Sequence, residues 1–161
     1  MKRLLTFVFL FVLTMLPASS IYAMGVFQGD MGYIPTPATN IGFTIIDTIG
    51  VRTYVEHGSI DGKAYISGYS GLILNVIPLD NIASVSFTKT TGAPAQLMDK
   101  LDNSPLLAVI HLKDNKVLNI IVDGSLLCYG RTPYGFIRVK LSSLEGIDDI
   151  KIFKKQNPRQ Q

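Results

Sequence analysis

Hydrophobic and polar residues alternate with a period of two along much of this chain. In one stretch, Ile137, Val139 and Leu141 would face one side of a strand, while Arg138 and Lys140 would face the other. Elsewhere, short apolar runs rich in Ile, Val, Tyr and Phe are separated by Gly, Asn and Asp. This pattern is typical of an antiparallel sheet that buries one face and exposes the other to solvent.

Turn sequences separate the apolar runs. Asp61-Gly62, Asp114-Asn115 and Asp123-Gly124 each lie between two such runs, and residues of these types favour tight turns between paired strands. We therefore predict an all-β domain over residues 41–153. Its architecture would be an antiparallel sandwich or a small barrel of about ten strands.

One segment of this domain lacks the alternation. Residues 90–105 are rich in small and polar side chains, and Pro94 to Leu101 has the length for two turns of helix. Leu97, Met98 and Leu101 would share one face of that helix. We expect a connector with one short helix, whose apolar face covers the end of the sheet.

The connector separates two stretches that resemble each other, residues 41–89 and 106–153. Asp61-Gly62 in the first recurs as Asp123-Gly124 in the second, 62 positions later. A lone unit of about 60 residues buries too little surface to fold well, so two such units would share one core. A β-meander with strands of similar length would look self-similar without duplication, and both interpretations stay open.

Near its end, each stretch also contains three apolar residues that are spaced three positions apart. These are Leu79, Ile82 and Val85 in the first stretch, and Leu144, Ile147 and Ile150 in the second. The order of Asp-Gly, short strand, glycines and this closing motif resembles a small β-module of exported bacterial proteins of uncharacterised function. The resemblance covers most of residues 45–153. It implies a compact β-sandwich or barrel outside the cytoplasm, and it brings no catalytic residues.

The first 23 residues have the pattern of a signal peptide. Lys2 and Arg3 precede an uncharged run from Leu4 to Leu16, and small residues follow, with cleavage expected after Ala23 or, alternatively, Ser20. The apolar run is shorter than the ~20 residues of a membrane-spanning helix. We predict a periplasmic or secreted protein without a stable membrane span after cleavage, with a retained anchor as the alternative.

The segments that flank the domain differ from it in composition. Residues 24–40 are predicted to form an extended arm, because Pro35 and Pro37 exclude a helix. Residues 154–161 are predicted to form a basic, flexible tail. The whole chain has a net charge of +3, yet residues 24–150 hold 9 basic and 12 acidic side chains. A slightly acidic domain argues against nucleic acid as a partner.

The sequence contains no recognisable catalytic constellation, and we predict no enzyme activity, metal or cofactor. His57 is interpreted as a turn residue and His111 as a solvent-facing strand residue, while Cys128, within an apolar strand, is interpreted as a small buried hydrophobe. Asp148 and Asp149 are adjacent, so their side chains should point to opposite faces of a strand. They would then not cooperate as an acid and a base.

The remaining chemical signal is a set of aromatic and basic residues near glycine-containing turns. As candidate binding residues we name Tyr65, Tyr69, Tyr129, Arg131, Tyr134 and Arg138. Tyr and Arg offer large contact areas together with hydrogen bonds, although Tyr is also common in strands for structural reasons.

These observations favour a non-enzymatic binding or assembly module of the cell envelope. Its partner would be another envelope protein or a copy of itself, and its extended arm could add a strand to a neighbour's sheet edge. The alternative is a ligand-binding or hydrolytic β-barrel with a pocket lined by Tyr65, Tyr129 and Arg131. A small molecule is therefore not excluded as a ligand.

Overall fold

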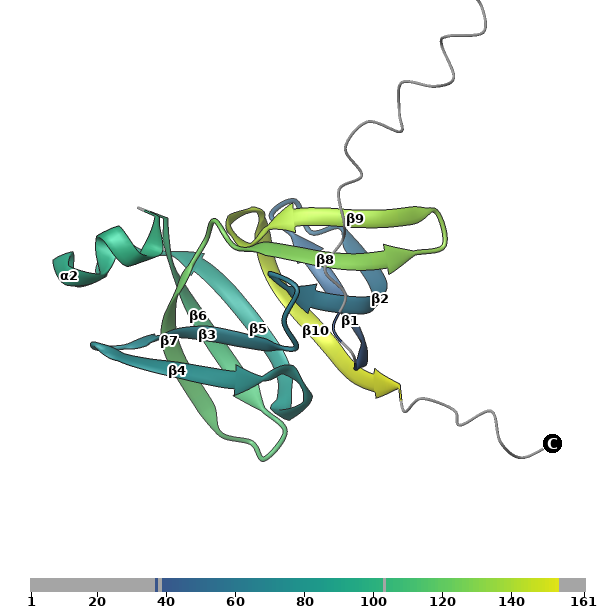
Figure 1. Cartoon of the computed structure of the whole chain (residues 1–161), viewed down its shortest axis with the longest axis horizontal. Helices are drawn as coiled ribbons and strands as arrows, with labels where there is room; N and C mark the ends of the chain where they lie inside the picture. Colours follow the sequence, from purple (N-terminus) through teal and green to yellow (C-terminus); the bar gives the residue numbers. More distant parts are fainter. Residues whose placement is uncertain (1–36, 38, 103, 154–161) are drawn as a thin grey trace, which may run out of the picture. The chain divides into compact units, whose positions relative to one another are not determined.

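The computed structural model describes residues 37, 39–102 and 104–153. The predicted signal peptide, most of the arm and the basic tail lie outside these residues. The described part contains ten antiparallel strands in one strongly curled sheet, a half-barrel, together with one short α-helix (Figure 1). The predicted all-β fold is thus confirmed, and its architecture is a curled sheet.

The strands fall into two sets of five, one on each side of the connector. The first set is β1 (Asn40–Asp47), β2 (Arg52–Ile60), β3 (Tyr65–Ser70), β4 (Ile73–Pro78) and β5 (Ile82–Lys89). The second set is β6 (Pro105–Leu112), β7 (Val117–Asp123), β8 (Leu127–Thr132), β9 (Gly135–Lys140) and β10 (Leu144–Phe153). A 3₁₀ turn precedes the last strand of each set, η3 (Leu79–Asn81) before β5 and η5 (Leu141–Ser143) before β10.

The order of strands in the sheet is β4-β3-β7-β6-β5-β10-β1-β2-β8-β9. Exchanging each strand with the one five places along the chain gives the same order read backwards. At the centre, Val85 of β5 pairs with Ile147 of β10, and these residues lie 62 positions apart. The sheet therefore has an approximate two-fold axis that passes between β5 and β10.

The two sets of strands exchange hairpins across this axis. The β3–β4 hairpin of the first set pairs with β7 of the second, and the β8–β9 hairpin of the second set pairs with β2 of the first. Equivalent hydrogen bonds close the two sets: the Leu79 N–H donates to the Ala64 carbonyl, and the Leu141 N–H donates to the Leu126 carbonyl, both at 2.9 Å. Each set thus completes its sheet with strands of the other.

The structure corrects the predicted alignment of the two sets. Leu79 corresponds to Leu141, 62 positions later, rather than to Leu144. The spacing is 65 only in the first strands, where the Phe43–Val55 pair corresponds to Ala108–Ile120. The spacing between equivalent positions changes from 65 to 62 within β2, where the register with β8 shifts between Glu56 and Ser59. Gene duplication itself stays a prediction.

A single core unites the two sets of strands. Its fully buried apolar side chains come from both, among them Phe43, Val55, Ile66, Leu79, Ile82, Ile110, Val122, Cys128, Leu141 and Ile147. The predicted alternation is confirmed in β9, where Arg138 and Lys140 are exposed while Ile137 and Val139 pack against this core. Burial of one face by an alternating strand is what stabilises the sheet.

The connector contains the predicted helix in a shorter form. Helix α2 (Ala95–Met98) continues directly into the 3₁₀ turn η4 (Asp99–Leu101). Leu97 and Leu101 are buried as expected, with exposed fractions of 1% and 2%, while Met98 is only half-buried. The η4 turn packs against β7, so the apolar face of the connector is covered by the sheet.

Candidate binding surfaces

The six predicted binding residues divide between two distant parts of the sheet. Tyr65 and Tyr69 lie on β3, Tyr129 and Arg131 on β8, and Arg138 on β9, with Tyr134 in the turn between β8 and β9. Six strands stand between β3 and β8 in the sheet order. The residues therefore form two sets at equivalent places in the two halves rather than one site.

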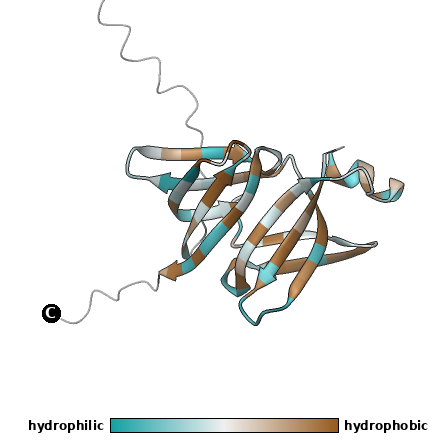
Figure 2. Cartoon of the chain, turned by 180° about the vertical axis from the view of Figure 1, so that it is seen from behind, coloured by the Kyte–Doolittle hydropathy of each residue, from teal (hydrophilic) through white to brown (hydrophobic). Residues whose placement is uncertain are grey.

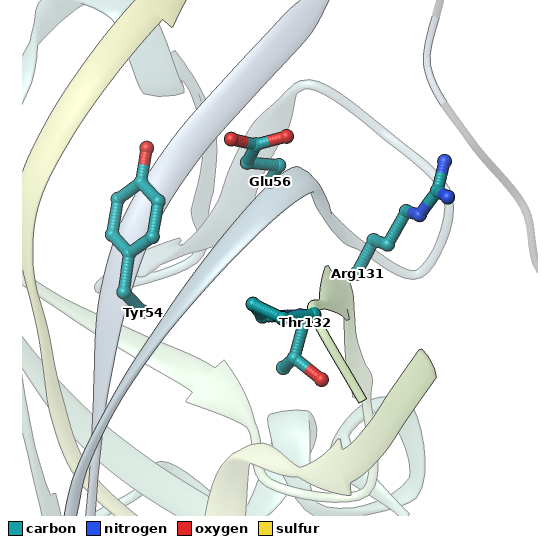
Figure 3. A pocket seen from close by; sticks show the side chains of 5 residues that line it. Tyr54, Glu56, Arg131 and Thr132 are labelled. Carbon is teal, nitrogen blue, oxygen red and sulfur yellow. The ribbon is translucent and has the colours of Figure 1, made fainter. Parts of the chain in front are cut away.

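One of the six residues, Arg131, lines a cavity of about 390 Å³ (Figure 3). Its lining consists of Tyr54, Glu56, Arg131, Thr132 and Pro133. Burial, and secondly the negative charge of Glu56, raises the pKa of the Tyr54 hydroxyl. This cavity includes Arg131 but neither Tyr65 nor Tyr129, so it does not assemble the combination predicted for a ligand pocket.

Arg131 is engaged outside the cavity. Its guanidinium lies 6.0 Å from the centre of the Phe136 ring, within the range of a cation–π contact. Figure 3 shows the guanidinium directed away from Tyr54. Because the cation points away from the hydroxyl, the two groups do not converge on a common ligand position.

Tyr54 was not among the sequence candidates, although a signal for it exists. Arg52, Tyr54 and Glu56 alternate with residues of the opposite face, which places all three on the outer side of β2. The Tyr54 ring extends over Gly42 of β1, where an added Cβ atom would also lie 2.7 Å from Phe153 Cε2. A side chain at position 42 would displace both rings.

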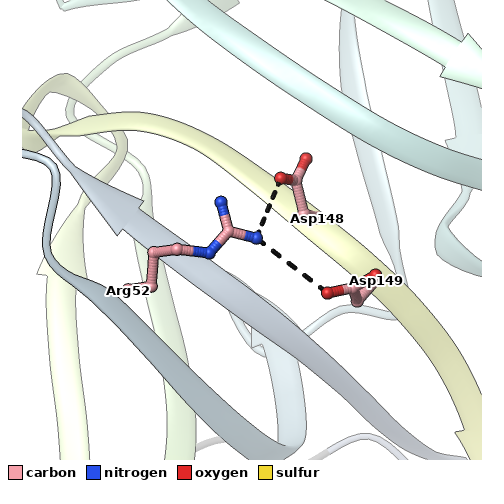
Figure 4. Close-up of polar contacts among 3 residues, drawn as sticks. All are labelled: Arg52, Asp148 and Asp149. Carbon is pink, nitrogen blue, oxygen red and sulfur yellow. Dashed lines mark hydrogen bonds and ion pairs between the residues drawn. The ribbon is translucent and has the colours of Figure 1, made fainter.

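Asp148 and Asp149 depart from the sequence prediction. Both carboxylates reach the Arg52 guanidinium, at 3.2 Å and 4.0 Å (Figure 4). Asp149 has φ of +53°, and this left-handed residue interrupts the alternation that would have separated the two side chains. The arginine thus joins β2 to β10 across β1 at a surface where solvent weakens the attraction.

Cys128 is buried, as predicted. Burial raises the pKa of its thiol to about 12, because the core does not solvate a thiolate. It occupies the position on β8 that corresponds to Ile66 on β3. The thiol therefore has the environment of a core side chain and is inaccessible to a second chain in the folded protein.

The two histidines lie in different settings. His111 is an exposed strand residue, as predicted. His57 lies within β2 instead of in a turn, and its φ of +51° marks the irregular part of this strand. Its backbone N–H donates to Asn40 Oδ1 at 2.9 Å. Among the residues that the structure describes, no three His, Cys, Asp or Glu side chains are grouped to hold a metal ion.

The strongest surface feature is the edge of the sheet at β4. We define the apolar edge as Leu72, Ile73, Leu74 and Val76, whose exposed fractions are 65%, 71%, 54% and 54%. Within the described strands, β4 has β3 as its only neighbour, and Tyr69 lies opposite Leu74. Figure 2 colours much of this half of the sheet as hydrophobic. An exposed apolar strand at an edge offers both side chains and backbone groups to a partner.

The equivalent edge at β9 has a different chemistry. Phe136 and Arg138 occupy the positions of Leu74 and Val76, and Lys140 that of Pro78. Charged side chains on an edge strand oppose pairing with another chain. The molecule thus has one protected edge and one apolar edge.

Comparison with protein-family models, with curated proteins and with solved structures found no match to this chain. The resemblance to exported β-modules therefore stays a prediction. In the described part of the chain, no helix has the length and hydrophobicity needed to cross a membrane.

Proposed function

We propose that this protein is a non-enzymatic, exported binding or assembly module of the cell envelope, and that it binds its partner through the apolar edge. The observation that carries the proposal is the exposure of four large apolar side chains, three on a strand with one paired side and Leu72 in the loop that precedes it. Leaving such side chains in water forgoes about 25 cal/mol for each Å² of apolar surface that a partner could cover. At the equivalent edge, exposed Phe136 is followed on β9 by Arg138 and Lys140, whose charges oppose pairing with another chain.

Further support comes from the residues beside this edge. Tyr65 and Tyr69, two of the predicted binding residues, flank β4 on β3. Both rings lie near cations, with Lys63 Nζ 5.8 Å from the Tyr65 ring centre and Lys100 Nζ 5.7 Å from that of Tyr69. Aromatic side chains beside an apolar surface are typical of protein interfaces. Export remains an expectation from the sequence of residues 1–23.

The proposal can be tested by site-specific photo-crosslinking in cells that express the full chain. The photoreactive residue replaces Leu72 at the apolar edge, and Tyr134, the equivalent position of the protected edge, serves as the matched control. Both side chains are exposed, at 65% and 100%. We expect a crosslinked adduct with another protein chain from position 72 and little from position 134. No adduct at position 72, or equal adducts at both positions, would contradict the proposal.

A further inference from the structure

We infer that the partner at the apolar edge is a second copy of this chain, and that β4 of one copy pairs antiparallel with β4 of the other. A two-fold axis near Asn75 would relate the copies and join their sheets into one. This inference rests on the proposed function, because it names the occupant of the same surface.

The hairpin geometry determines which backbone groups of β4 are offered to a partner. Ser70 pairs with Ile73 across a two-residue loop, and such loops close on a pair that exchanges hydrogen bonds. Alternate residues then direct their N–H and C=O groups away from β3. Counting from Ile73 assigns Leu74 and Val76 to this outward set, together with Pro78, which has no N–H to offer β3.

The side chain of Asn75 makes its hydrogen bond away from the outward backbone groups of Leu74 and Val76. Its amide Nδ2 donates to the Ile73 carbonyl at 3.1 Å, and Ile73 belongs to the set that faces β3. The local bond therefore does not compete with a strand that pairs with Leu74 and Val76. Two copies centred on Asn75 would each donate and accept through these two residues.

Apart from the central pair of Asn75 side chains, the cross-strand neighbours in this arrangement are apolar. Leu74 of one copy would lie opposite Val76 of the other, and Ile73 opposite Ile77, all of which are apolar. Contacts between directly opposed apolar side chains stabilise paired strands. The same surface thus matches itself without any change of sequence, as a two-fold interface requires.

The distribution of charged residues favours pairing with a second copy at the β4 edge and disfavours it at the β9 edge. Neither β3 nor β4 contains an Asp, Glu, Lys or Arg, so two copies of this hairpin do not repel each other. The nearby ammonium groups of Lys63 and Lys100 lie one strand back, at Tyr65 and Tyr69. Pairing β9 with itself would instead place two copies of Arg138 and Lys140 along one joined edge, and charged side chains on an edge strand oppose such pairing.

The size of the contact predicts a weak dimer. β4 has only six residues, so an edge pairing lies at the low end of specific interfaces, below about 1,200 Å² in total. We therefore expect association in the micromolar range, which makes the oligomeric state depend on concentration.

The test is sedimentation of the full exported chain over a concentration series, with two matched variants. Leu74→Lys/Val76→Lys gives the apolar edge the charged character of β9, and Phe136→Lys adds a charge at the position of β9 that corresponds to Leu74. We expect the unmodified chain and Phe136→Lys to dimerise alike, and the double variant to weaken dimerisation by at least about tenfold. Circular dichroism establishes that each variant is folded.

Hydrogen exchange then locates the contact. Slower exchange of the Leu74 and Val76 amides at high concentration is the expected result, since these are the outward groups. A chain that stays monomeric, a double variant that dimerises as well as the unmodified chain, or dimerisation that requires residues 24–36 would overturn the inference. The crosslinking at position 72 separates the two proposals: an adduct with a different protein refutes self-pairing and leaves the proposed function standing.

Discussion

At the scale of single residues, two glycines hold the exchanged hairpins against the rest of the sheet. A Cβ atom added at Gly68 would lie 2.7 Å from Val122 Cγ1, and one added at Gly130 would lie 2.5 Å from the Val55 Cβ. In each case the neighbour belongs to the other set of five strands. The absence of a side chain at these positions therefore permits the contact between the two halves.

Replacing Gly130 by Ala should destabilise the protein through overpacking, by about 1–3 kcal/mol. Gly92→Ala is the matched control, because the nearest atom to its added Cβ is Thr90 Oγ1 at 3.6 Å. Urea denaturation should show a lower midpoint for the first variant and little change for the second. Equal urea midpoints for the two variants would contradict this prediction, because they would mean that β2 and β8 make room for the added methyl group without loss of stability.

The thiol of Cys128 predicts a dependence of stability on pH. Its pKa is about 12 in the folded protein against a usual value of 9.0, so between these values the unfolded chain loses a proton that the folded chain keeps. The stabilisation is complete below about pH 9 and falls by up to about 1.4 kcal/mol per pH unit above it. Cys128→Ala should have a shallower decline than the unmodified chain in urea titrations between pH 8 and pH 10. Parallel declines would contradict the burial of the thiol.

At the scale of elements, alternation in the sequence predicted which face of a strand is buried. Val85 and Phe87 are buried, and Ser86 between them is exposed, as the pattern indicates. Two interpretations were wrong: His57 lies in a strand instead of a turn, and Asp148 and Asp149 both reach Arg52, with positive φ angles at His57 and Asp149 that interrupt the period of two. Such irregularities depend on the register with neighbouring strands, which a local pattern does not contain.

The connector helix offers a test at the same scale. Leu97 is buried at 1% exposure, so Leu97→Ala should lower stability by about 2–5 kcal/mol through the lost packing and the cavity left behind. Met98→Ala, on the neighbouring and half-buried position, should cost clearly less. Thermal or urea unfolding of the two variants measures this difference. A larger loss of stability for Met98→Ala would show that Met98, and not Leu97, lies on the packed face of the helix.

At the scale of the whole molecule, the order of strands was beyond sequence reasoning. The repeated Asp-Gly and leucine motifs predicted two similar units on one core, yet they do not show that β3 pairs with β7 or that β8 pairs with β2. The candidate site was predicted only in part: Tyr65 and Tyr69 flank the apolar edge, while Leu74 and Val76 read as ordinary strand residues. Whether a strand lies at an edge is a property of the assembled sheet.

The exchange of hairpins predicts that the two halves stay together when the connector is cut. A protease site introduced at Gly92, which has open surroundings, would separate β1–β5 from β6–β10 covalently. We expect both fragments to coelute in size-exclusion chromatography and to part only in denaturant, because each half supplies strands to the sheet of the other. Elution as two separate fragments would show that each half is self-sufficient.

The exchange of hairpins also determines when, during synthesis, each strand can meet its neighbours in the sheet. When β5 has emerged from the ribosome or from a translocation channel, β2 and β3 still lack the strands β8 and β7 that border them. The neighbours of β3 and β4 are complete once β7 has appeared and those of β2 once β8 has appeared, whereas β1 and β5 must wait for β10. The first five strands therefore cannot complete their part of the sheet during their own synthesis, and the last step of assembly waits for the C-terminal strand.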